Sequence, residues 1–436
     1  MAKSRARSWA GHLQAPAGQG QAPCLLAYSG GADSTALLHL AVEQALPGLR
    51  AVHVHHGLQA AADDWAAHCQ QVCAGLGVPL EVLRVQVAAD DPAGPESAAR
   101  SARYAALRSR LPSGGLLLTA HHRDDQAETV LLRLLRGSGV DGLAAIRSFI
   151  RFDPGWLWRP LLAVPGAALR DYLRERGIDW IEDPHNQSPR YARSWLRQEL
   201  IPRLRLRWPE AEQQLAATAA RCAEAAELLA ELAAEGLPAV QREDGGLSVS
   251  GLLALRPARR HLLLRHWLEQ LGLPAVYDET LRHLDCEVLA VRPDAEPLLA
   301  WPGGEFRRYR DGLYAAARLP PLPEDYAVEW DGRSLLELPA GCGRLLPAGP
   351  LKVTVRLPRG GERLRLAGEA HHRSLRALAQ REGLPPWVRQ RLALLYVGDD
   401  LLSIAGHWHA EHKPRCEYIQ SWSTAELPGL PLSWRR

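Results

Sequence analysis

The stretch Ser29-Gly30-Gly31-Ala32-Asp33-Ser34-Thr35 decides the fold of this chain. An apolar run at residues 24–28 precedes it, and a helix-like run at residues 36–41 follows it. A strand, a glycine turn and a helix start in this order predict an anion cradle, built from backbone N–H groups and the positive end of the helix dipole. We therefore expect this loop to bind the phosphates of a nucleotide.

The loop differs from a Walker loop, which places a lysine before its final serine or threonine. Gly30 and Gly31 give the backbone freedom, and their missing Cβ atoms let an oxyanion approach the amides. Ser29 and Ser34 would add hydroxyl donors, and Asp33 beside a polyphosphate is expected to bind magnesium or to orient the loop amides. The alternative is a glycine-rich turn in which Asp33 is an ordinary helix cap.

The composition is typical of a large enzyme. The chain has 436 residues, 47% of them hydrophobic, which predicts two or three domains. No apolar run approaches the roughly 18 residues that cross a bilayer, and residues 1–5 do not begin a signal sequence. We therefore expect a cytoplasmic protein with a mobile tail at residues 1–21. The seven cysteines include no Cys-x-x-Cys pair, which favours reduced thiols.

Between residues 22 and 212, strand-like runs alternate with helical patterns. The runs lie at residues 24–28, 51–55, 81–87 and 116–120. This alternation predicts an α/β fold with a doubly wound, mostly parallel sheet, whose ligand crevice lies beyond the carboxyl ends of the strands. Each motif described below begins at one of these strand ends or on the helix that follows it.

The rest of the chain predicts a helical block and then a mixed one. Heptad spacing predicts a packing helix at about 210–235, which Gly236 and Pro238 end. Helices at 257–271 and 278–291, and strands around tight turns at 301–314, follow. The overall charge is only +3, but residues 351–415 hold twelve Lys and Arg against six Asp and Glu. A basic C-terminal block is one sign of a nucleic-acid partner, although a solvated face is the alternative.

Several further segments resemble one family. They are Val52–Leu58 (VHVHHGL), Glu96–Arg100 with Arg103 and Tyr104, Ala120–Thr129, Arg136–Gly139, Arg159–Leu162, Glu182–Asn186 and Leu384–Arg391. Together with SGGADS, they are similar to the tRNA(Ile)-lysidine synthetases of the PP-loop, or N-type ATP pyrophosphatase, superfamily. The resemblance covers nearly the whole chain from about residue 22. It implies a PP-loop catalytic domain at 22–212, a mainly helical tRNA-binding domain at 213–330 and a smaller α+β tRNA-binding domain at 345–436.

The resemblance implies a defined reaction. ATP would be cleaved to AMP and pyrophosphate while the wobble cytidine of the CAU anticodon of tRNA(Ile) is adenylated, and the side-chain amine of L-lysine would then form lysidine. The implied cofactors are ATP and Mg²⁺, the partners are tRNA(Ile) and L-lysine without a membrane, and we allow for a homodimer. One alternative is another PP-loop adenylating enzyme such as a tRNA thiolase, although the paired cysteines of many such enzymes are missing. Another is a non-catalytic tRNA-binding protein.

The expected site residues follow from these motifs. Asp125 and Glu128 are three apart at a helix start, so both carboxylates share one face, and they are expected to bind magnesium or a cationic amine. Arg100 and Arg103 likewise share a face and would neutralise phosphate. The predicted phosphate-binding residues are Ser29, Gly30, Gly31, Ala32, Asp33 and Ser34. The predicted catalytic residues are Asp33, Arg100, Arg103, His122, Asp125 and Glu128, with Asp33 and Asp125 as the magnesium ligands.

Two points stay open from the sequence. The resemblance favours either His121 or His122 near the adenylate, without deciding which of them faces the site. His53 and His55 share a strand face, so a transition-metal site is the alternative use of the histidines. The chain also departs from the family pattern: His55 and Ser194 replace asparagines, and residues 371–376 replace a lysine-rich segment.

Overall fold

The structure is a computed structural model in which the chain forms two compact units, residues 1–228 and 229–436. It describes residues 13, 15–57, 61–86, 95–182, 192–292, 295–346, 350, 352–366, 369–405, 407–410 and 420–421. Most of the expected tail at residues 1–21 lies outside the described residues. Leu13 is buried in the core of the first unit, so packing begins before residue 22.

The first unit contains a six-stranded sheet. Its strands, in spatial order, are β3 (Leu80–Arg84), β2 (Arg50–His55), β1 (Cys24–Ala27), β4 (Leu116–Leu118), β6 (Gly155–Trp158) and β5 (Phe149–Phe152). All neighbours are parallel except β5 and β6. The parallel sheet and its four predicted strands are confirmed, with ends shifted by a few residues. The sequence did not predict β5 and β6, because four-residue strands show too little periodicity.

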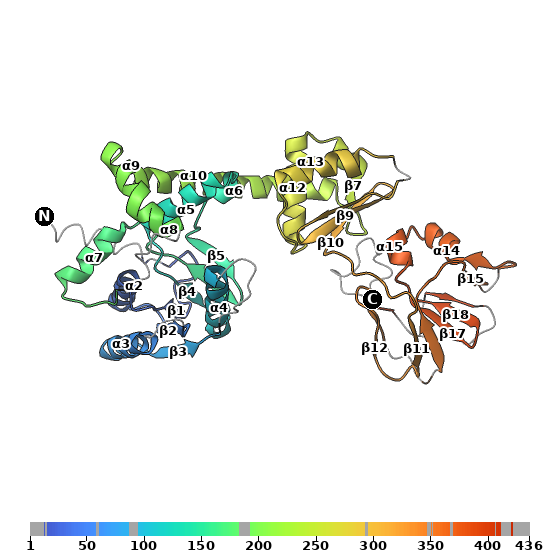
Figure 1. Cartoon of the computed structure of the whole chain (residues 1–436), viewed down its shortest axis with the longest axis horizontal. Coiled ribbons are helices and arrows are strands. Elements are labelled where there is room, and N and C mark those ends of the chain that lie inside the picture. The colour runs from blue at the N-terminus through green and yellow to red at the C-terminus, as the bar shows by residue number, and fades with distance from the viewer. Residues whose placement is uncertain are drawn as a thin grey trace. The chain divides into compact units, whose positions relative to one another are not determined.

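Helices cover both faces of this sheet (Figure 1). Leu26 on β1 packs with α2 (Ala32–Glu43), α3 (Ala62–Gly75) and α7 (Gly166–Glu175). Leu25, the next residue, packs on the opposite face with α4 (Pro95–Arg110). Successive side chains of a strand point to opposite faces, so an uninterrupted apolar run such as residues 24–27 is buried on both. The doubly wound α/β fold is therefore confirmed.

The buried cysteines of this unit are predicted to resist alkylation. Cys69 and Cys73 are fully buried on α3, and burial raises the pKa of their thiols to about 12 and about 11. Cys286 in the second unit is exposed. Because the thiolate is the reactive form, iodoacetamide should label Cys286 in the native protein and reach Cys69 and Cys73 only after unfolding. Mass spectrometry of the labelled peptides measures this, and rapid native labelling of Cys69 or Cys73 would contradict the packing.

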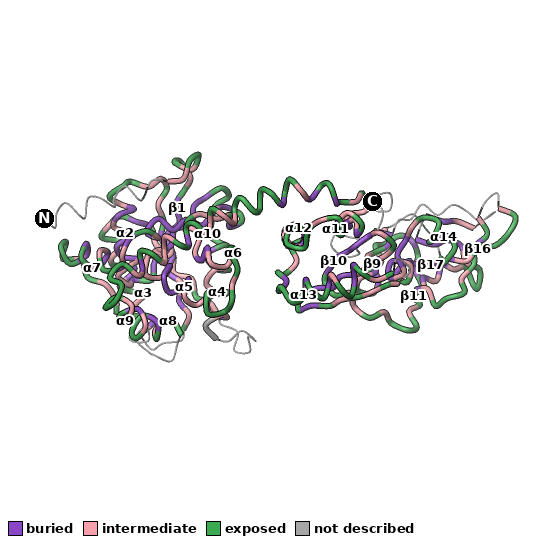
Figure 2. The backbone as a smooth tube through the Cα atoms, turned by 90° about the horizontal axis from the view of Figure 1, so that it is seen from above, coloured by how far each residue is buried: buried purple, intermediate pink, exposed green. Residues whose placement is uncertain are grey.

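A second set of helices completes the first unit, which ends at Leu228 within the last of them. They are α5 (Arg123–Leu135), α6 (Val140–Leu143), α8 (Ala192–Trp195), the π-helical turn Leu196–Leu200, α9 (Ile201–Arg207) and α10 (Ala211–Gly236). The helix predicted at 210–235 is α10, and it ends at Gly236 as expected. Its Leu215 and Ala219 pack against Val130 of α5. Leu229 and Leu232, further along the predicted stripe, are 39% and 41% exposed, and the second half of α10 is largely exposed in Figure 2.

The second unit begins with a helical layer on an antiparallel sheet. After the 3₁₀ turn Leu237–Ala239, the helices are α11 (Val249–Leu253), α12 (Pro257–Gln270), α13 (Asp278–His283) and the π-helical turn Leu284–Leu289. The sheet order is β7 (Leu247–Ser248), β10 (Gly312–Ala316), β9 (Gly304–Tyr309) and β8 (Leu298–Trp301). Both predicted helices and the strands predicted within 301–314 are confirmed.

The C-terminal part of this unit is an α+β arrangement. A five-stranded sheet has the order β11 (Ala327–Trp330), β14 (Val353–Arg356), β17 (Leu394–Val397), β18 (Asp400–Ile404) and β19 (Trp408–His409). Smaller sheets join β12 (Leu336–Glu337), β13 (Arg344–Leu345) and β20 (Gln420–Ser421), and β15 (Arg363–Leu364) with β16 (Arg373–Ser374), beside α14 (Leu375–Arg381) and α15 (Pro386–Arg389). Because β11 pairs with β14, residues 327–330 belong to the C-terminal sheet. Within the described ranges, every helix is too short or too polar to span a bilayer.

Candidate active site

The candidate site lies where the strand order of the first sheet reverses. β1 and β4 are neighbours in the sheet, although β2 and β3 separate them in the sequence. At such a switch point the connections leave toward opposite faces and open a crevice beyond the carboxyl ends of the strands. The loop before α2 and the loop before α5 both begin at this edge, so the structure brings SGGADS and the residues 121–128 together.

Gly30 gives the first loop its shape. Its φ is +82°, and a Cβ atom there would lie 2.5 Å from Cδ1 of Ile181 and 3.0 Å from Sγ of Cys69. The Gly30 carbonyl accepts hydrogen bonds from the Ile181 N–H at 2.9 Å and the Thr35 hydroxyl at 3.2 Å. Only glycine adopts this conformation in so close a space without strain. The tertiary contacts therefore hold the loop in one shape.

The two loop serines have different surroundings. The Ser34 hydroxyl is buried, donates to the Gly31 carbonyl at 3.0 Å and accepts the Ser29 N–H at 3.3 Å. Ser29 is exposed, and its hydroxyl lies 3.0 Å from that of Ser34. Ser34 thus shapes the loop, and Ser29 faces the solvent-accessible side.

The N-terminus of α2 is open to an anion. Its N-cap residue is Gly31, and no side chain among the described residues caps it. The interpretation of Asp33 as an ordinary cap is therefore wrong, because Asp33 lies inside the first helical turn. The first amides of a helix have no partner within the helix, so those at Ala32–Ser34 carry the positive end of the dipole outward. This arrangement suits a phosphate group.

Asp33 faces His122 across the switch point. Their Oδ2 and Nε2 atoms are 3.4 Å apart, and Oδ1 of Asp33 is buried without a hydrogen-bond partner in the described part of the chain. Burial opposes ionisation of Asp33, but the bond and charge of His122 outweigh it and lower the pKa of the carboxyl. Asp33 is therefore ionised at neutral pH, with one oxygen left for a ligand.

His122 contacts the carboxylates of the switch point. It is 3% exposed, and its Nε2 also lies 3.6 Å from Oδ2 of Asp125. Burial opposes protonation, but Asp33, Asp125 and Asp124 together raise its pKa to about 9. The N–H of Asp124 donates to Nδ1 at 3.2 Å, which needs a free lone pair there and so resists full protonation. Three carboxylates lie around one ring, so their negative charge outweighs the hydrogen bond from the Asp124 N–H in setting the pKa of His122.

His121 has the opposite character. Its Nδ1 lies 2.9 Å from the Thr119 hydroxyl, and burial lowers its pKa to about 3. His121 is therefore neutral at physiological pH. The two histidines therefore have different surroundings: His122 contacts the predicted carboxylates, and His121 lies beside arginines.

Asp125 and Glu128 lie on one face of α5, as predicted, because Arg197 reaches both. Nε and Nη2 of Arg197 donate to the two oxygens of Glu128 at 2.7 and 3.1 Å, and Nη2 lies 3.4 Å from Oδ1 of Asp125. Glu128 is fully buried, and burial raises its pKa despite the arginine. Arg197 is not among the predicted site residues, and it lies 69 residues from Glu128. The only sequence signal near it was Ser194, three residues earlier, where the family pattern has an asparagine.

Arginines form a cationic group near His121. The guanidinium groups of Arg100 and Arg103 lie 4.9 and 5.7 Å from the centre of the Tyr104 ring. Arg159, which was also not predicted, is buried, and the charges of all three lower the pKa of His121 further. None of the three pairs with a carboxylate of the described chain. Partly desolvated arginines without counter-ions are suited to bind phosphate.

The site fits a magnesium ion only with a phosphate ligand present. Nowhere in the described ranges do three His, Cys, Asp or Glu side chains converge as a complete metal site. Asp33, with its unpartnered buried oxygen, and Asp125 are the carboxylates at the switch point. Mg²⁺ is commonly held by one or two carboxylates together with substrate phosphates, so this donor set suits it.

Three predicted pieces cannot be placed. Residues 183–186 of the motif at 182–186, and Leu58, lie outside the described residues, as does the side chain of Glu96. Ser194, noted as a departure from the family pattern, lies on α8.

Three protein-family models match consecutive parts of the chain. A PP-loop domain matches residues 3–204, a TilS substrate binding domain matches residues 247–314, and a TilS substrate C-terminal domain matches residues 353–422. The first match contains every residue of the site described above. The other two correspond to the two parts of the second unit.

Curated relatives match along most of the chain. A protein of Xanthomonas campestris pv. campestris (strain 8004) is 46% identical over 88% of this chain and 90% of its own length. Proteins of Pseudomonas aeruginosa (strain PAO1) and Serratia proteamaculans (strain 568) are 44% and 41% identical over 93% and 94% of this chain and 94% and 95% of their own lengths. All three are named tRNA(Ile)-lysidine synthase.

Likeness to solved structures is weaker. A U34-tRNA thiolase of Methanococcus maripaludis with its [4Fe-4S] cluster is 17% identical, covers 51% of this chain and 78% of its own, and has a TM-score of 0.42. An NH3-dependent NAD synthetase of Campylobacter jejuni is 15% identical, covers 51% of this chain and 93% of its own, and has a TM-score of 0.26. These values support no conclusion about function.

Proposed function

Because this chain belongs to the tRNA(Ile)-lysidine synthase family, it is an enzyme that forms lysidine on tRNA, and we propose that it does so by adenylating the wobble cytidine at the switch point of its PP-loop sheet. In this proposal ATP is cleaved between its α and β phosphates, and L-lysine then replaces AMP on the base. The observation that carries the proposal is that three features lie at one edge of the sheet: an α2 N-terminus that no described side chain caps, an ionised Asp33, and arginines that pair with no described carboxylate.

The phosphates of ATP are proposed to lie on the amides at the start of α2. Phosphoryl transfer needs little covalent help from a protein, so positioning and charge stabilisation do most of the work. Arg100, Arg103 and Arg159 would hold the departing pyrophosphate, since they face no carboxylate of the described residues. Mg²⁺, held by Asp33 and Asp125, would offset phosphate charge during the transfer.

The amine of L-lysine is proposed to approach through Asp125. Both oxygens of Glu128 are bonded to Arg197, whereas Asp125 has one 3.4 Å contact with that arginine and a side chain that is 16% exposed. Asp125, which would hold Mg²⁺ during adenylation, is therefore the carboxylate left for the cationic amine in the second step, and Glu128 acts by positioning Arg197. Glu128 stays within the predicted catalytic set in this supporting role.

The assay that tests this function measures transfer of labelled L-lysine into tRNA(Ile) with a CAU anticodon. The full-length protein, ATP and Mg²⁺ should give lysidine together with equal amounts of pyrophosphate and AMP. The control tRNA carries uridine at the wobble position and should stay unlabelled. Folded protein that binds this tRNA and ATP without incorporating lysine would refute the proposal, and a screen of sulfur donors in the same assay tests the thiolase alternative.

The second unit is proposed to hold the tRNA backbone through arginines. Arg310 and Arg376 are exposed, and Arg389 lies near both of them. Burial lowers the pKa of Arg389, and the charges of Arg376 and Arg310 lower it further. Cations that repel one another are stabilised by a polyanion that binds across them.

Replacing Arg310 and Arg376 by alanine is expected to weaken tRNA binding and to reduce its dependence on salt. Each lost phosphate contact lowers the slope of log Kd against log salt by about one, while pyrophosphate release at saturating tRNA should persist. Point variants are preferable to removal of residues 345–436, which would take β14 and β13 away from β11 and β12. Arg174→Ala, an exposed arginine of the first unit, is the control and should leave the slope unchanged.

A cytoplasmic location, a homodimer and the domain limits 22–212, 213–330 and 345–436 stay predictions. Sedimentation of the purified protein with and without tRNA measures the assembly.

A further inference from the structure

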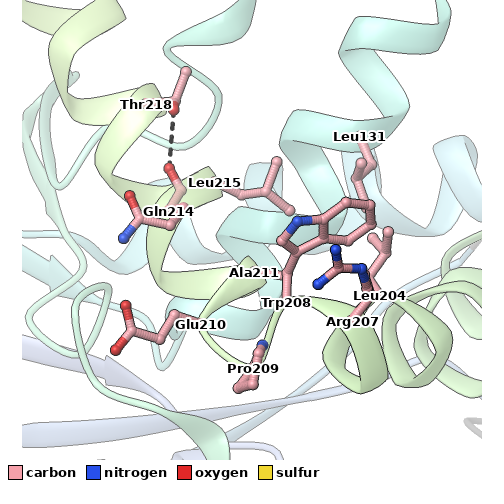
Figure 3. Close-up of a pocket in the computed structure, with 10 residues that line it drawn as sticks. All are labelled: Leu131, Leu204, Arg207, Trp208, Pro209, Glu210, Ala211, Gln214, Leu215 and Thr218. Carbon is pink, nitrogen blue, oxygen red and sulfur yellow. Dashed lines mark hydrogen bonds between the residues drawn. The ribbon is translucent and has the colours of Figure 1, made fainter.

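A second hollow lies in the first unit, apart from the phosphate loop. It has a volume of about 700 Å³ and lies between α5, α9 and α10. The indole of Trp208 lies among the side chains of Leu131, Leu204 and Leu215, with the guanidinium of Arg207 beside it (Figure 3). The volume falls within the roughly 300–1,000 Å³ of pockets that take small organic ligands. This hollow is called the Trp208 pocket below.

The Trp208 pocket is preformed. The backbone N–H of Trp208 donates to the Leu204 carbonyl at 2.7 Å, and the backbone N–H of Ala211 donates to the Trp208 carbonyl at 3.0 Å. These bonds fix the turn between α9 and α10, and Pro209 stiffens it. The indole is nevertheless 60% exposed. A large aromatic face held on a rigid turn and left open is a surface that a planar ligand can stack on at little entropic cost.

The pocket shares two helical segments with the candidate active site. Leu131 lies one turn after Glu128 on α5, and side chains three residues apart share a helix face. Arg197, bonded to Glu128, lies in the π-helical turn that leads directly into α9. The same two helical segments therefore carry the site that handles the target cytidine and the pocket beyond it.

Two charged side chains line the pocket, Arg207 and the exposed Glu210, and further arginines lie along α9. Three arginines alternate along α9, and two of them have acidic partners: Arg203 pairs with Glu199, and Arg205 with Glu212. Arg207 is exposed and pairs with no carboxylate of the described residues. An aromatic platform beside a free arginine is the usual means of holding an unpaired base, with the arginine on its phosphate.

We propose that the Trp208 pocket binds one unpaired nucleobase of the tRNA anticodon loop, other than the wobble cytidine, and so orients the loop over the active site. This inference rests on the proposed function. An anticodon loop offers unstacked bases next to the target, and stacking on an indole requires only a π face. The pocket thus supplies a second hold on the RNA, close to the reacting base.

The test measures Kd for tRNA(Ile) with Trp208→Ala, Trp208→Phe and the control Leu206→Ala. Leu206 is 88% exposed on α9, two residues before Trp208, and does not line the pocket. Loss of one base–aromatic stack corresponds to roughly tenfold weaker binding, so Trp208→Ala should bind about tenfold more weakly, while the phenylalanine and control variants stay within about threefold.

A second arm uses transcripts with a single abasic site at each anticodon-loop position except the wobble position. One abasic transcript should bind the wild-type enzyme about tenfold more weakly and should bind Trp208→Ala no worse than the intact transcript does. The inference would be overturned if Trp208→Ala bound tRNA as tightly as the wild type does. It would also be overturned if Trp208→Ala bound more weakly but still distinguished every abasic transcript from the intact one as the wild type does. A variant that alters self-association instead of tRNA binding would also overturn it, by assigning the pocket to a second copy.

The two proposals fail differently. A wild-type enzyme that forms lysidine while Trp208→Ala binds tRNA normally refutes the pocket alone. A wild-type enzyme that binds the tRNA and ATP without forming lysidine refutes the proposed function.

Discussion

Asp33→Asn is expected to lower tRNA-dependent pyrophosphate release by at least about 1,000-fold. Asparagine keeps the size of the side chain but removes the negative charge that would hold a divalent ion beside the phosphates. It also removes the counter-charge that His122 faces at 3.4 Å. The affinity for tRNA should change by less than about twofold, because Asp33 belongs neither to the arginines proposed to bind RNA in the second unit nor to the Trp208 pocket.

The measurement is a coupled pyrophosphate assay at saturating ATP, with tRNA binding measured separately. Asp171→Asn is the matched control, since Asp171 is an exposed carboxylate of the same unit that pairs with Arg174. A full rate in Asp33→Asn would remove Asp33 from the reaction. An equal loss of tRNA affinity and rate would show that the substitution had disturbed the fold instead.

Arg197→Ala is expected to destabilise the first unit and to lower lysine transfer by at least about 100-fold. It leaves the fully buried Glu128 without its bidentate partner. Breaking a buried ion pair costs roughly 3–5 kcal/mol, and we expect about 2 kcal/mol here because the Arg197 side chain is 45% exposed and partly screened. Chemical denaturation followed by circular dichroism measures this loss.

The loss of stability in Arg197→Ala should depend on pH with a defined sign. The pKa of Glu128 is already raised by burial, and losing the arginine raises it further. A carboxyl whose pKa is raised by folding is tolerated below its unfolded pKa and destabilises the fold as pH rises through the folded value. The gap to wild type should therefore be small near pH 4 and grow toward neutral pH.

Two variants separate the buried charge from a general packing effect. Adding Glu128→Gln to Arg197→Ala should restore part of the stability at neutral pH and none of the lysine transfer, because the uncompensated charge is gone while the site remains incomplete. Arg203→Ala, which breaks an exposed helix pair with Glu199, should change stability by less than about 0.5 kcal/mol. A loss in Arg197→Ala that does not vary with pH would contradict the charge argument.

The histidines show how far local sequence reasoning reaches. The motif at 120–129 placed both His121 and His122 at a strand end, which β4 and the start of α5 confirm. It did not decide between them, because their roles depend on what faces each ring. Asp33, about 90 residues earlier in the chain, faces one, and the arginine group faces the other.

The exposed half of α10 and the Trp208 pocket also show that local sequence patterns do not predict which residues are covered. Heptad spacing correctly predicted the helix, because periodicity is a property of the segment itself. Whether Leu229 or Trp208 is covered depends on what packs against each of them, which spacing cannot tell.

The amino-acid sequence by itself determined the parallel sheet, the phosphate loop and the long helix of this protein. Each of these depends on interactions within a few residues: alternation along a strand, glycine in a turn, and the dipole of one helix. The tertiary structure alone decided that Arg197 pairs with Glu128, that Arg159 joins the arginine group, that His122 meets Asp33 and that the short strands β5 and β6 extend the sheet. These contacts join segments far apart in the chain, and burial sets their strength, so no local pattern encodes them.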